Sequence, residues 1–455
     1  MRRSGTRTGG NPPGASRPLR VALMVEDFPV ISETFVINMA AGLVAAGHDV
    51  TILAVSGEKP APADMHRDVA RWGLDGRTRR PFAGSTLIGR FAPDVEGEEP
   101  SSWGIARRIA AFVAQAVTLV RQPRFDVVHC QFAHLGLTAR RHRRAHTLRC
   151  DRLVVHVRGQ DVTSFVRTHG EDVYRTLFAE ADLVIANSRH FRDRAVQLGA
   201  PVGSTIVIGS AVDCSAFAPS PAGPDPVGSD GVEPDTDGAD TAGADRGTSD
   251  GTRVAMIAVG RLVPKKGLDT AIRAMAELRS SLPGATLEIV GEGPMRNRLE
   301  GLVDELDLRG VVTLHGARPH DVVIERFAAC DLLLAPSVTP SSGDQDAPVN
   351  SLKEAMAMGL PVIGTRHGGI PELVEPGTNG YLVDEGDPVD LAEAIRTAVA
   401  ERGRWPEMGA AGRERILREY DLPVVTDRLI RAYRALFPTC DPRHTPPTTD
   451  RGVRP

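Results

Sequence analysis

Short apolar runs alternate with segments of helical spacing along most of the chain. Few polar residues interrupt the runs and turn residues bound them, which is typical of strands covered on both faces and therefore of parallel sheets built from βαβ units. A helical pattern at 34–46 follows the first run. The predicted strands are 19–25, 49–55, 126–129, 152–157, 183–186, 205–208, 253–259, 286–290, 311–314, 332–335 and 361–364.

A stretch rich in proline, glycine and aspartate, 219–252, separates two groups of predicted strands. Almost nothing in it can join a hydrophobic core, so it predicts a disordered acidic linker or insertion. We expect an α/β protein with two Rossmann-like, doubly wound parallel-sheet domains, 19–218 and 253–421, facing a cleft where the carboxyl edges of the strands bind ligands. The ends, 1–18 and 438–455, have the composition of disordered tails.

Composition narrows the partners and the compartment. The chain has 54 Lys+Arg against 58 Asp+Glu, a net charge of −4, so no overall basic field indicates nucleic acid. Its five cysteines are widely spaced and form no CxxC pair, which favours a reducing compartment. The basic N-terminus lacks the apolar segment of a secretory signal. We therefore expect a cytoplasmic protein, with peripheral contact at the inner face of an anionic membrane left open.

The loop after the strand at 253–259 gathers positive charge. The segment VGRLVPKKGLD, 259–269, holds Arg261, Lys265 and Lys266, although the whole chain has only four lysines. A helix is predicted to begin near Gly267. Cations and a helix N-terminus at one strand end predict an anion site, and a fork-shaped guanidinium beside a point charge suits a diphosphate. The alternative is a solvated basic turn.

A second polar loop follows the strand at 332–335. It contains GDQDAPVN and leads into a helix predicted at 349–358, which carries Glu354. Carboxylates such as Asp346 and Glu354 can accept hydrogen bonds from sugar or ribose hydroxyls. Taken alone, Glu354 fits an exposed helix position equally well.

These segments resemble glycosyltransferase family 4. The resemblance rests on GRLVPKKG, DAPVNSLKEAMAMGLPVIGT, RHGGIPELVEPGTNGYLV and VGEGPMRNRLE in the second half, and on FPVISETFV, DVVHCQFAHLG and RGQDVTSF in the first. It covers nearly all of the chain outside the tails and the linker. The family consists of retaining enzymes of the GT-B fold that use nucleotide sugars, and the chain looks most similar to members that build exopolysaccharides or lipid-linked glycans. The resemblance also implies that the last helix, 422–437, packs back on the first domain.

The resemblance assigns donor-side residues. Arg261 and Lys266 would hold the diphosphate, Glu354 the ribose, and Asp346 the donor sugar, at the position where the family has a glutamate. Arg318 would border the base, and the register of the loop leaves Asp344 as a competitor of Asp346. The predicted donor-binding set is Arg261, Lys266, Arg318, Asp346, Asn350 and Glu354.

The first domain supplies the predicted acceptor side. The family's histidine near the donor sugar is replaced in RGQD by Arg158, which would donate to sugar or phosphate and completes a catalytic set with Arg261 and Lys266. The loop 29–35 lacks the common glycine pair of the family, so its polar residues become candidates. The predicted acceptor-side residues are Ser32, Glu33, Thr34, His129 and Asp161.

Other motifs carry alternatives. The DxD patterns at 235–237 and 344–346 match metal-binding sequences of another glycosyltransferase fold, but the first lies in the linker and the cations near the second make a metal redundant. We therefore expect no metal and no cofactor besides the nucleotide-sugar co-substrate. The basic stretch 139–149 predicts a helix with a solvated face or, alternatively, a surface for an acceptor phosphate or an anionic membrane.

The sequence predicts a metal-independent hexosyltransferase. It would move a sugar from a UDP- or GDP-sugar to a hydroxyl of a glycan or a lipid-linked acceptor, with retained configuration. Two alternatives stay open. One is a GT-B nucleotide-sugar epimerase, and the other is a non-catalytic protein that binds nucleotide sugars or glycans on the same scaffold. An oxidoreductase is disfavoured because no GxGxxG follows the first strand.

Overall fold

The structure is a computed structural model of the protein. The described residues are 17–30, 33–55, 67–80, 112–113, 115–219, 253–347 and 349–437. The predicted linker 219–252, the tails and the predicted acceptor residue Ser32 lie outside these ranges, apart from the residues at their borders.

The first half of the chain forms one parallel sheet. Its strand order is β3-β2-β1-β4-β5-β6-β7, so the direction of the crossovers reverses between β1 and β4. The strands are β1 Arg20–Val25, β2 Asp49–Ala54, β3 Thr78–Arg79, β4 Phe125–Cys130, β5 Cys150–Val157, β6 Leu183–Ala186 and β7 Thr205–Val207. The helices are α1 Thr34–Ala45, α2 Arg67–Arg71, α4 Ala133–Arg144, α5 Ser164–His169, α6 Arg175–Glu180 and α7 Arg189–Gln197.

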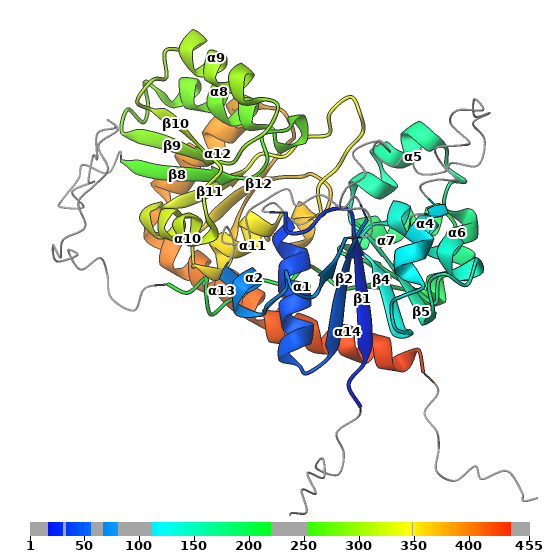
Figure 1. Ribbon diagram of the computed structural model, residues 1–455. Coiled ribbons are helices and arrows are strands. Elements are labelled where there is room, and N and C mark those ends of the chain that lie inside the picture. The colour runs from blue at the N-terminus through cyan, green and yellow to red at the C-terminus, as the bar shows by residue number, and fades with distance from the viewer. Residues whose placement is uncertain are drawn as a thin grey trace, which may run out of the picture.

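The second half forms another parallel sheet, beside the first in Figure 1. Its order is β10-β9-β8-β11-β12-β13, and the crossovers reverse between β8 and β11. The strands are β8 Val254–Val259, β9 Ala285–Val290, β10 Val312–Gly316, β11 Leu332–Ala335, β12 Val362–Thr365 and β13 Gly380–Val383. The helices are α8 Leu268–Leu278, α9 Arg296–Glu305, α10 His320–Ala329, α11 Asn350–Ala357, α12 Pro388–Ala400, α13 Trp405–Glu419 and α14 Leu422–Ala435.

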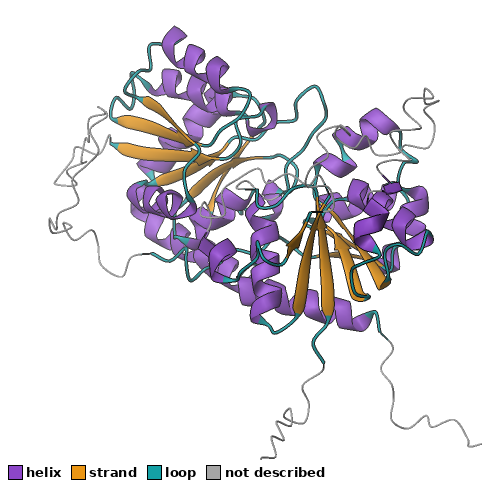
Figure 2. Ribbon diagram, in the orientation of Figure 1, coloured by secondary structure: helices purple, strands orange, loops and turns teal. Residues whose placement is uncertain are grey.

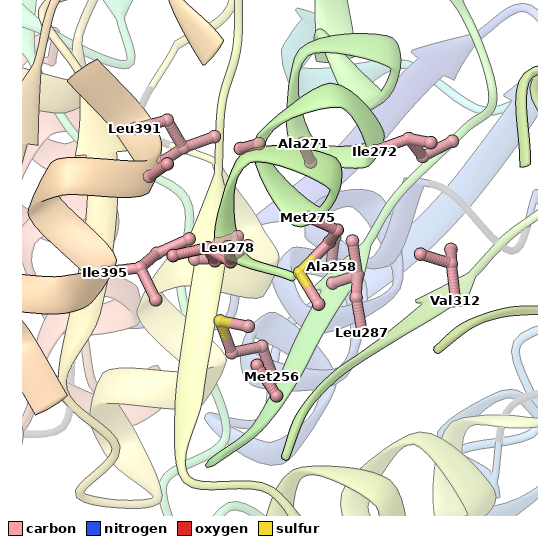
Figure 3. Packing of buried hydrophobic residues seen from close by; sticks show 14 of the residues in the cluster. Met256, Ala258, Ala271, Ile272, Met275, Leu278, Leu287, Val312, Leu391 and Ile395 are labelled. Carbon is pink, nitrogen blue, oxygen red and sulfur yellow. The ribbon is translucent and has the colours of Figure 1, made fainter. Parts of the chain in front are cut away.

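Both faces of each sheet are covered, as Figure 2 shows. On one face of the second sheet, Met256 and Leu287 from the strands meet Met275 of α8, with Leu391 and Ile395 of α12 beyond them (Figure 3). The opposite face is a separate apolar cluster that includes Ile257 and α11. Successive residues of β8 therefore enter different cores, which explains why the strand reads as an unbroken apolar run.

Helix α14 returns to the first domain, where it packs against α1 and runs along the lower side of Figure 1. Val425, Leu429 and Tyr433 are buried in the same apolar cluster as Ile37 of α1. Gly42 permits this approach, because a Cβ there would lie 2.1 Å from Oγ1 of Thr426. The end of the chain thus contributes to the core of its first half.

The predicted fold class is confirmed, and each predicted strand appears with its ends displaced by at most two residues. The prediction missed β3 and β13, which lie at sheet edges. Strand β3 has only two residues, and β13 reads GYLV, a run of three apolar residues after a glycine. The predicted basic helix 139–149 was wrong in extent. Helix α4 begins earlier and ends at Arg144, after which His146 takes a positive φ of 56° and reverses the chain.

Candidate functional site

The loop after β8 lies at the reversal point of the second sheet. A one-turn 3₁₀ helix, Pro264–Lys266, places two lysines between β8 and α8. Gly267 adopts a φ of 58°, and a Cβ there would lie 1.9 Å from the carbonyl oxygen of Pro336. Only glycine fits at this position. The loops after β8 and β11 therefore pack closely, at the edge where doubly wound sheets bind ligands.

Two lysines and two aspartates meet between these loops. Nζ of Lys266 lies 2.8 Å from Oδ2 of Asp346, and Nζ of Lys265 lies 2.9 Å from Asp344 and 3.4 Å from Asp346. Ser337 donates a further hydrogen bond to Asp346, at 3.0 Å. Burial by itself raises the pKa of Asp346, but Lys266 and Lys265 outweigh it and hold that pKa below its usual value.

The positive charge of both lysines is therefore balanced by Asp344 and Asp346. Arg261, in contrast, is exposed, and its guanidinium has no hydrogen bond or ion pair with any other described residue. Its guanidinium is the cation of this loop that has donors free for an anion. The sequence predicted Lys266 as a phosphate ligand but not that it would form an ion pair with Asp346.

His367 supports the backbone of Asp346, and no sequence-based prediction assigned it a role. The Asp346 N–H donates to Nε2 of His367 at 2.9 Å, and Nδ1 of the fully buried imidazole donates to Glu385 at 2.8 Å. A Cβ on Gly368 would lie 2.0 Å from the Asp346 carbonyl oxygen. The motif RHGGIPE was part of the family resemblance, and its histidine and glycine fix the Asp346 backbone.

Helix α11 adds a buried carboxylate to the same edge. Glu354 is only 7% exposed, and no described residue donates a hydrogen bond to its carboxylate. Burial raises its pKa to about 7, although the neighbouring Lys353 opposes the shift. A buried carboxylate without a donor is costly unless a ligand supplies one. This burial removes the alternative that Glu354 is an exposed helix residue.

Lys353 and Asn350 join the two domains. Lys353 is 1% exposed, and its Nζ donates to the Ser210 carbonyl oxygen at 2.8 Å. Asn350 donates to Oγ1 of Thr34 at 3.3 Å. Burial lowers the Lys353 pKa to about 7. The sequence singled out Asn350 and Thr34 on opposite sides of the site, and the structure brings them together.

Arg158 follows β5 and lies beneath the first-domain side of the site. Its guanidinium donates to the carbonyl and the side-chain oxygens of Gln131, at 3.0 and 2.6 Å, and to Oγ of Ser210 at 3.2 Å. It also stacks on the ring of Phe35, 3.9 Å from the centroid. Burial lowers its pKa to about 9. Several N–H groups of the Arg158 guanidinium are therefore used in contacts within the protein.

Glu33 lies within electrostatic reach of a cation from each domain. Burial raises its pKa to about 7, and the positive charges of Arg158 and Arg261 oppose that shift. Its Oε2 is buried and has no hydrogen-bond partner. Among the predicted acceptor-side residues, Glu33 is therefore the one with a buried side-chain oxygen that accepts no hydrogen bond from a described residue.

His129 does not reach this surface, which corrects its predicted contact with the acceptor. The side chain is fully buried, with Nδ1 2.6 Å from the Tyr433 hydroxyl and Nε2 3.3 Å from Nδ1 of His156. Burial lowers its pKa to about 3. It joins β4 to α14 as a neutral core residue, because the strand directs it away from the site.

Asp161 is also buried and is engaged by the backbone. One carboxylate oxygen accepts from the N–H groups of Arg158 and Gly159, at 3.0 and 2.9 Å, and the other accepts from Ala133 N–H at 2.9 Å. Both oxygens therefore brace the turn after β5 against the start of α4. This arrangement makes Asp161 a positioning residue, in place of the predicted acceptor contact.

The two domains touch through the loop that carries Asp346. Gln345 accepts from Nε2 of His190 at 2.9 Å, and Ser341 accepts from Arg167 at 2.6 Å. At the N-terminus of α7, the N–H groups of Arg189 and His190 donate to Glu372 at 2.8 and 2.7 Å. The contacts of Gln345 and Ser341 hold the loop after β11 against the carboxyl edge of the first sheet, and those of Glu372 hold the segment after β12 there.

Comparison with known proteins identifies the chain. Residues 32–211 match the family described as glycosyl transferase 4-like domain, and residues 244–415 match glycosyl transferases group 1. A putative colanic acid biosynthesis glycosyltransferase of Salmonella typhimurium is 30% identical over 405 residues, which is 85% of this chain and 91% of that protein. The chain belongs to the GT-B glycosyltransferases of family 4 type.

Other relatives and structures agree with this assignment. A putative colanic acid biosynthesis glycosyltransferase of Escherichia coli is 28% identical over 437 residues, covering 92% of this chain and all of that protein. The crystal structure of Anabaena HepE in complex with UDP-glucose superposes with a TM-score of 0.66 at 19% identity, covering 92% of this chain and 100% of that one. At this identity, the likeness shows the fold.

The remaining predicted positions of the glycosyltransferase are less informative. Arg318 is exposed after β10, and Ser32 lies outside the described residues. Within the described ranges, no group of three or more His, Cys, Asp or Glu residues is placed to hold a metal ion. No helix in those ranges is long and apolar enough to cross a membrane.

Proposed function

We propose that this glycosyltransferase transfers a sugar from a nucleoside-diphosphate sugar to a hydroxyl of a glycan or lipid-linked acceptor, with retained anomeric configuration. The observation that carries the proposal is the cationic loop of Arg261, Lys265 and Lys266 at the reversal point of the second sheet, beside the unpartnered Glu354. Both the exopolysaccharide relatives and the UDP-glucose complex of the Anabaena protein support it.

In this proposal Glu354 accepts hydrogen bonds from the ribose hydroxyls, and Arg261 binds the diphosphate. Lys266 turns from Asp346 to the phosphate, while Lys265 continues to compensate Asp346, which then accepts from the donor sugar. Arg318 borders the base and Asn350 lies beside the phosphates. In these contacts, groups of the donor become the hydrogen-bond partners that the side chains of Glu354 and Arg261 lack among the described residues.

The reaction follows from where charge develops. The bond from C1 to the diphosphate oxygen breaks, the acceptor oxygen bonds to C1 on the same face, and the acceptor proton passes to the departing phosphate oxygen. Negative charge grows on the diphosphate, where Arg261 and Lys266 stabilise it. Glu33 would orient the acceptor hydroxyl, with Thr34 beside it, and Arg158 would hold the wall of the site.

We further propose that no metal takes part, because the two cations supply the charge that a metal would provide. A cytoplasmic location, inferred from the cysteine usage, belongs to the same proposal. A lipid-linked acceptor would be met at the surface of an anionic membrane, which the protein would contact peripherally.

The test is transfer by the purified protein from a panel of UDP- and GDP-sugars, with the product configuration read by NMR. Lys266→Ala should lower kcat about 100-fold, a loss of about 3 kcal/mol in transition-state stabilisation. Arg298→Ala, an exposed cation on α9, is the matched control and should retain the wild-type rate. Addition of a chelator should leave the rate unchanged.

Three results would contradict the proposal. They are Lys266→Ala activity within a few-fold of wild type, an epimerised donor in the absence of acceptor, and donor binding without turnover across the acceptor panel. Loss of activity with chelator, restored by Mn²⁺, would overturn the metal-independent reaction alone.

A further inference from the structure

A cavity of about 500 Å³ lies at the opposite edge of the first sheet from the donor site. Its walls come from the start of β4 and β5, the end of α4 and the end of α6. These elements lie together at the right of Figure 1. The lining residues are Arg124, Arg143, Arg144, His146, Leu148, Arg149, Cys150 and Glu180.

The lining carries four guanidinium groups and one carboxylate. Arg144 pairs with Glu180, and Arg143 and Arg124 pair with Asp182 and Asp151, which lie outside the lining. A guanidinium has five N–H donors, so each of these pairs leaves donors unused. The cavity therefore presents an excess of positive charge with fork-shaped donors.

Arg149 has no carboxylate partner among the described residues. Its Nη2 donates to the carbonyl oxygens of Gln122 and Val120, at 2.7 and 3.4 Å. The reversal of the chain at His146, with its φ of 56°, brings Arg149 back beside the end of α4. Histidine adopts a left-handed backbone more readily than most residues, and here that conformation ends α4 and returns the chain to the wall of the cavity.

Three exposed valines end at Val120, whose carbonyl oxygen accepts from Arg149 of the cavity. Val113, Val117 and Val120 are 53%, 46% and 47% exposed, and their i, i+4, i+7 spacing places them on one helix face. The opposite face is buried, since Gln115 accepts a hydrogen bond of 2.6 Å from His142 of α4. Exposed apolar side chains beside arginines are typical of surfaces that lie on anionic lipid.

We propose that this arginine cavity binds a phosphate group, at a site separate from the sugar-transfer site. Arginine forks suit the oxygens of a phosphate, and the cavity is large enough for a phosphate with a glycerol-sized substituent. The phosphate belongs either to an anionic phospholipid headgroup or to a soluble phosphate ester. The bordering valines favour the phospholipid.

The experiment uses the full chain and two probes. Glycerol 3-phosphate is titrated calorimetrically, and vesicles of phosphatidylcholine with or without phosphatidylglycerol are co-sedimented with the protein. Arg124→Gln/Arg144→Gln changes two side chains that are 69% and 64% exposed, so the fold should be retained. We expect it to weaken binding of at least one probe ten-fold or more. Arg279→Gln/Arg309→Gln, an exposed pair in the second domain, should bind like wild type.

Val117→Ser/Val120→Ser separates the sources of the phosphate. Weaker vesicle binding with unchanged glycerol 3-phosphate binding supports the phospholipid, and wild-type behaviour in both assays supports the soluble ester. Binding of neither probe by wild type overturns the proposal, as does equal binding by the arginine variant. Transfer to a soluble acceptor should be unchanged in all of these variants, so failure here is distinguishable from failure of the proposed reaction.

Discussion

Lys265, Lys266, Asp344 and Asp346 form a balanced group of charges at the centre of the proposed donor site. A pair of lysines without these aspartates would repel each other and resist burial. The aspartates allow both lysines to stay charged between two packed loops until a diphosphate arrives. Since Lys265 contacts both carboxylates, Lys266 can leave Asp346 without stranding it.

Glu354 should make the protein less stable as the pH rises. Burial raises its pKa from about 4.5 to about 7, so the folded state favours the neutral acid. The stabilising contribution is present below the pKa of the unfolded chain and is lost as the pH rises through about 7. Glu354→Gln should therefore be more stable than wild type at pH 8, by about 1–3 kcal/mol, in denaturant unfolding.

At pH 4.5 or below the two proteins should differ little, which is the internal control. Glu354→Gln should also raise the KM for the donor ten-fold or more, because the amide accepts ribose hydrogen bonds less strongly than a carboxylate. A stability difference that does not change with pH would show that Glu354 is not held neutral by its burial.

The place of a side chain in the site could be predicted where its position in the chain determines which way it points. The family resemblance placed both Lys266 and Asp346 in the donor site, and the structure shows that they follow adjacent strands, β8 and β11. His129 and Asp161 also lie near strand ends, but one turns into the core and the other binds backbone N–H groups. Nothing in a single sequence distinguishes these directions. His367 was missed because the resemblance assigned its motif no chemistry.

At the scale of elements, loops after different strands touch through glycine. A Cβ on Gly159, in the turn after β5, would lie 2.6 Å from the Gln345 carbonyl oxygen in the loop after β11. The φ of Gly159 is 140°. The turn therefore fixes how closely the two sheets approach at the loop that bears Asp346.

Gly159→Ala should lower kcat/KM more than ten-fold, because the methyl group pushes the Asp346 loop away from the first domain. Gly170→Ala is the matched control, since Gly170 has a φ of 95° but nothing within 4 Å of a Cβ. Both variants carry backbone strain, and only the first carries the clash between domains. Equal activity of the two in steady-state transfer assays would contradict this role of Gly159.

Strands could be predicted well because both faces of each sheet are buried. The apolar runs of β6 and β11 coincide with the observed strands, whereas the edge strand β3 has only two residues and the edge strand β13 has a shorter run of three apolar residues after a glycine. The end of α4 could not be placed, because ARRHRRAHTLR has no glycine or proline to mark the stop. His146, which has a positive φ, ends the helix instead.

At the scale of the whole molecule, the two domains share polar contacts as well as α14. Lys353 donates to Ser210 across the domains, and Glu372 accepts from the start of α7. The sequence predicts two doubly wound sheets, but their relative placement depends on such pairs. Those pairs join residues that are far apart in the chain, and no local pattern specifies them.

Calorimetric titration with nucleoside mono- and diphosphates tests the central claim most directly, because it needs neither sugar nor acceptor. We predict that wild type binds UDP or GDP at least 100-fold more tightly than UMP or GMP. Arg261→Ala/Lys266→Ala should remove that preference, since the charge-assisted bonds to the second phosphate contribute about 1.5–3 kcal/mol each. If the double variant keeps the preference for the diphosphate, the loop after β8 does not bind the leaving group.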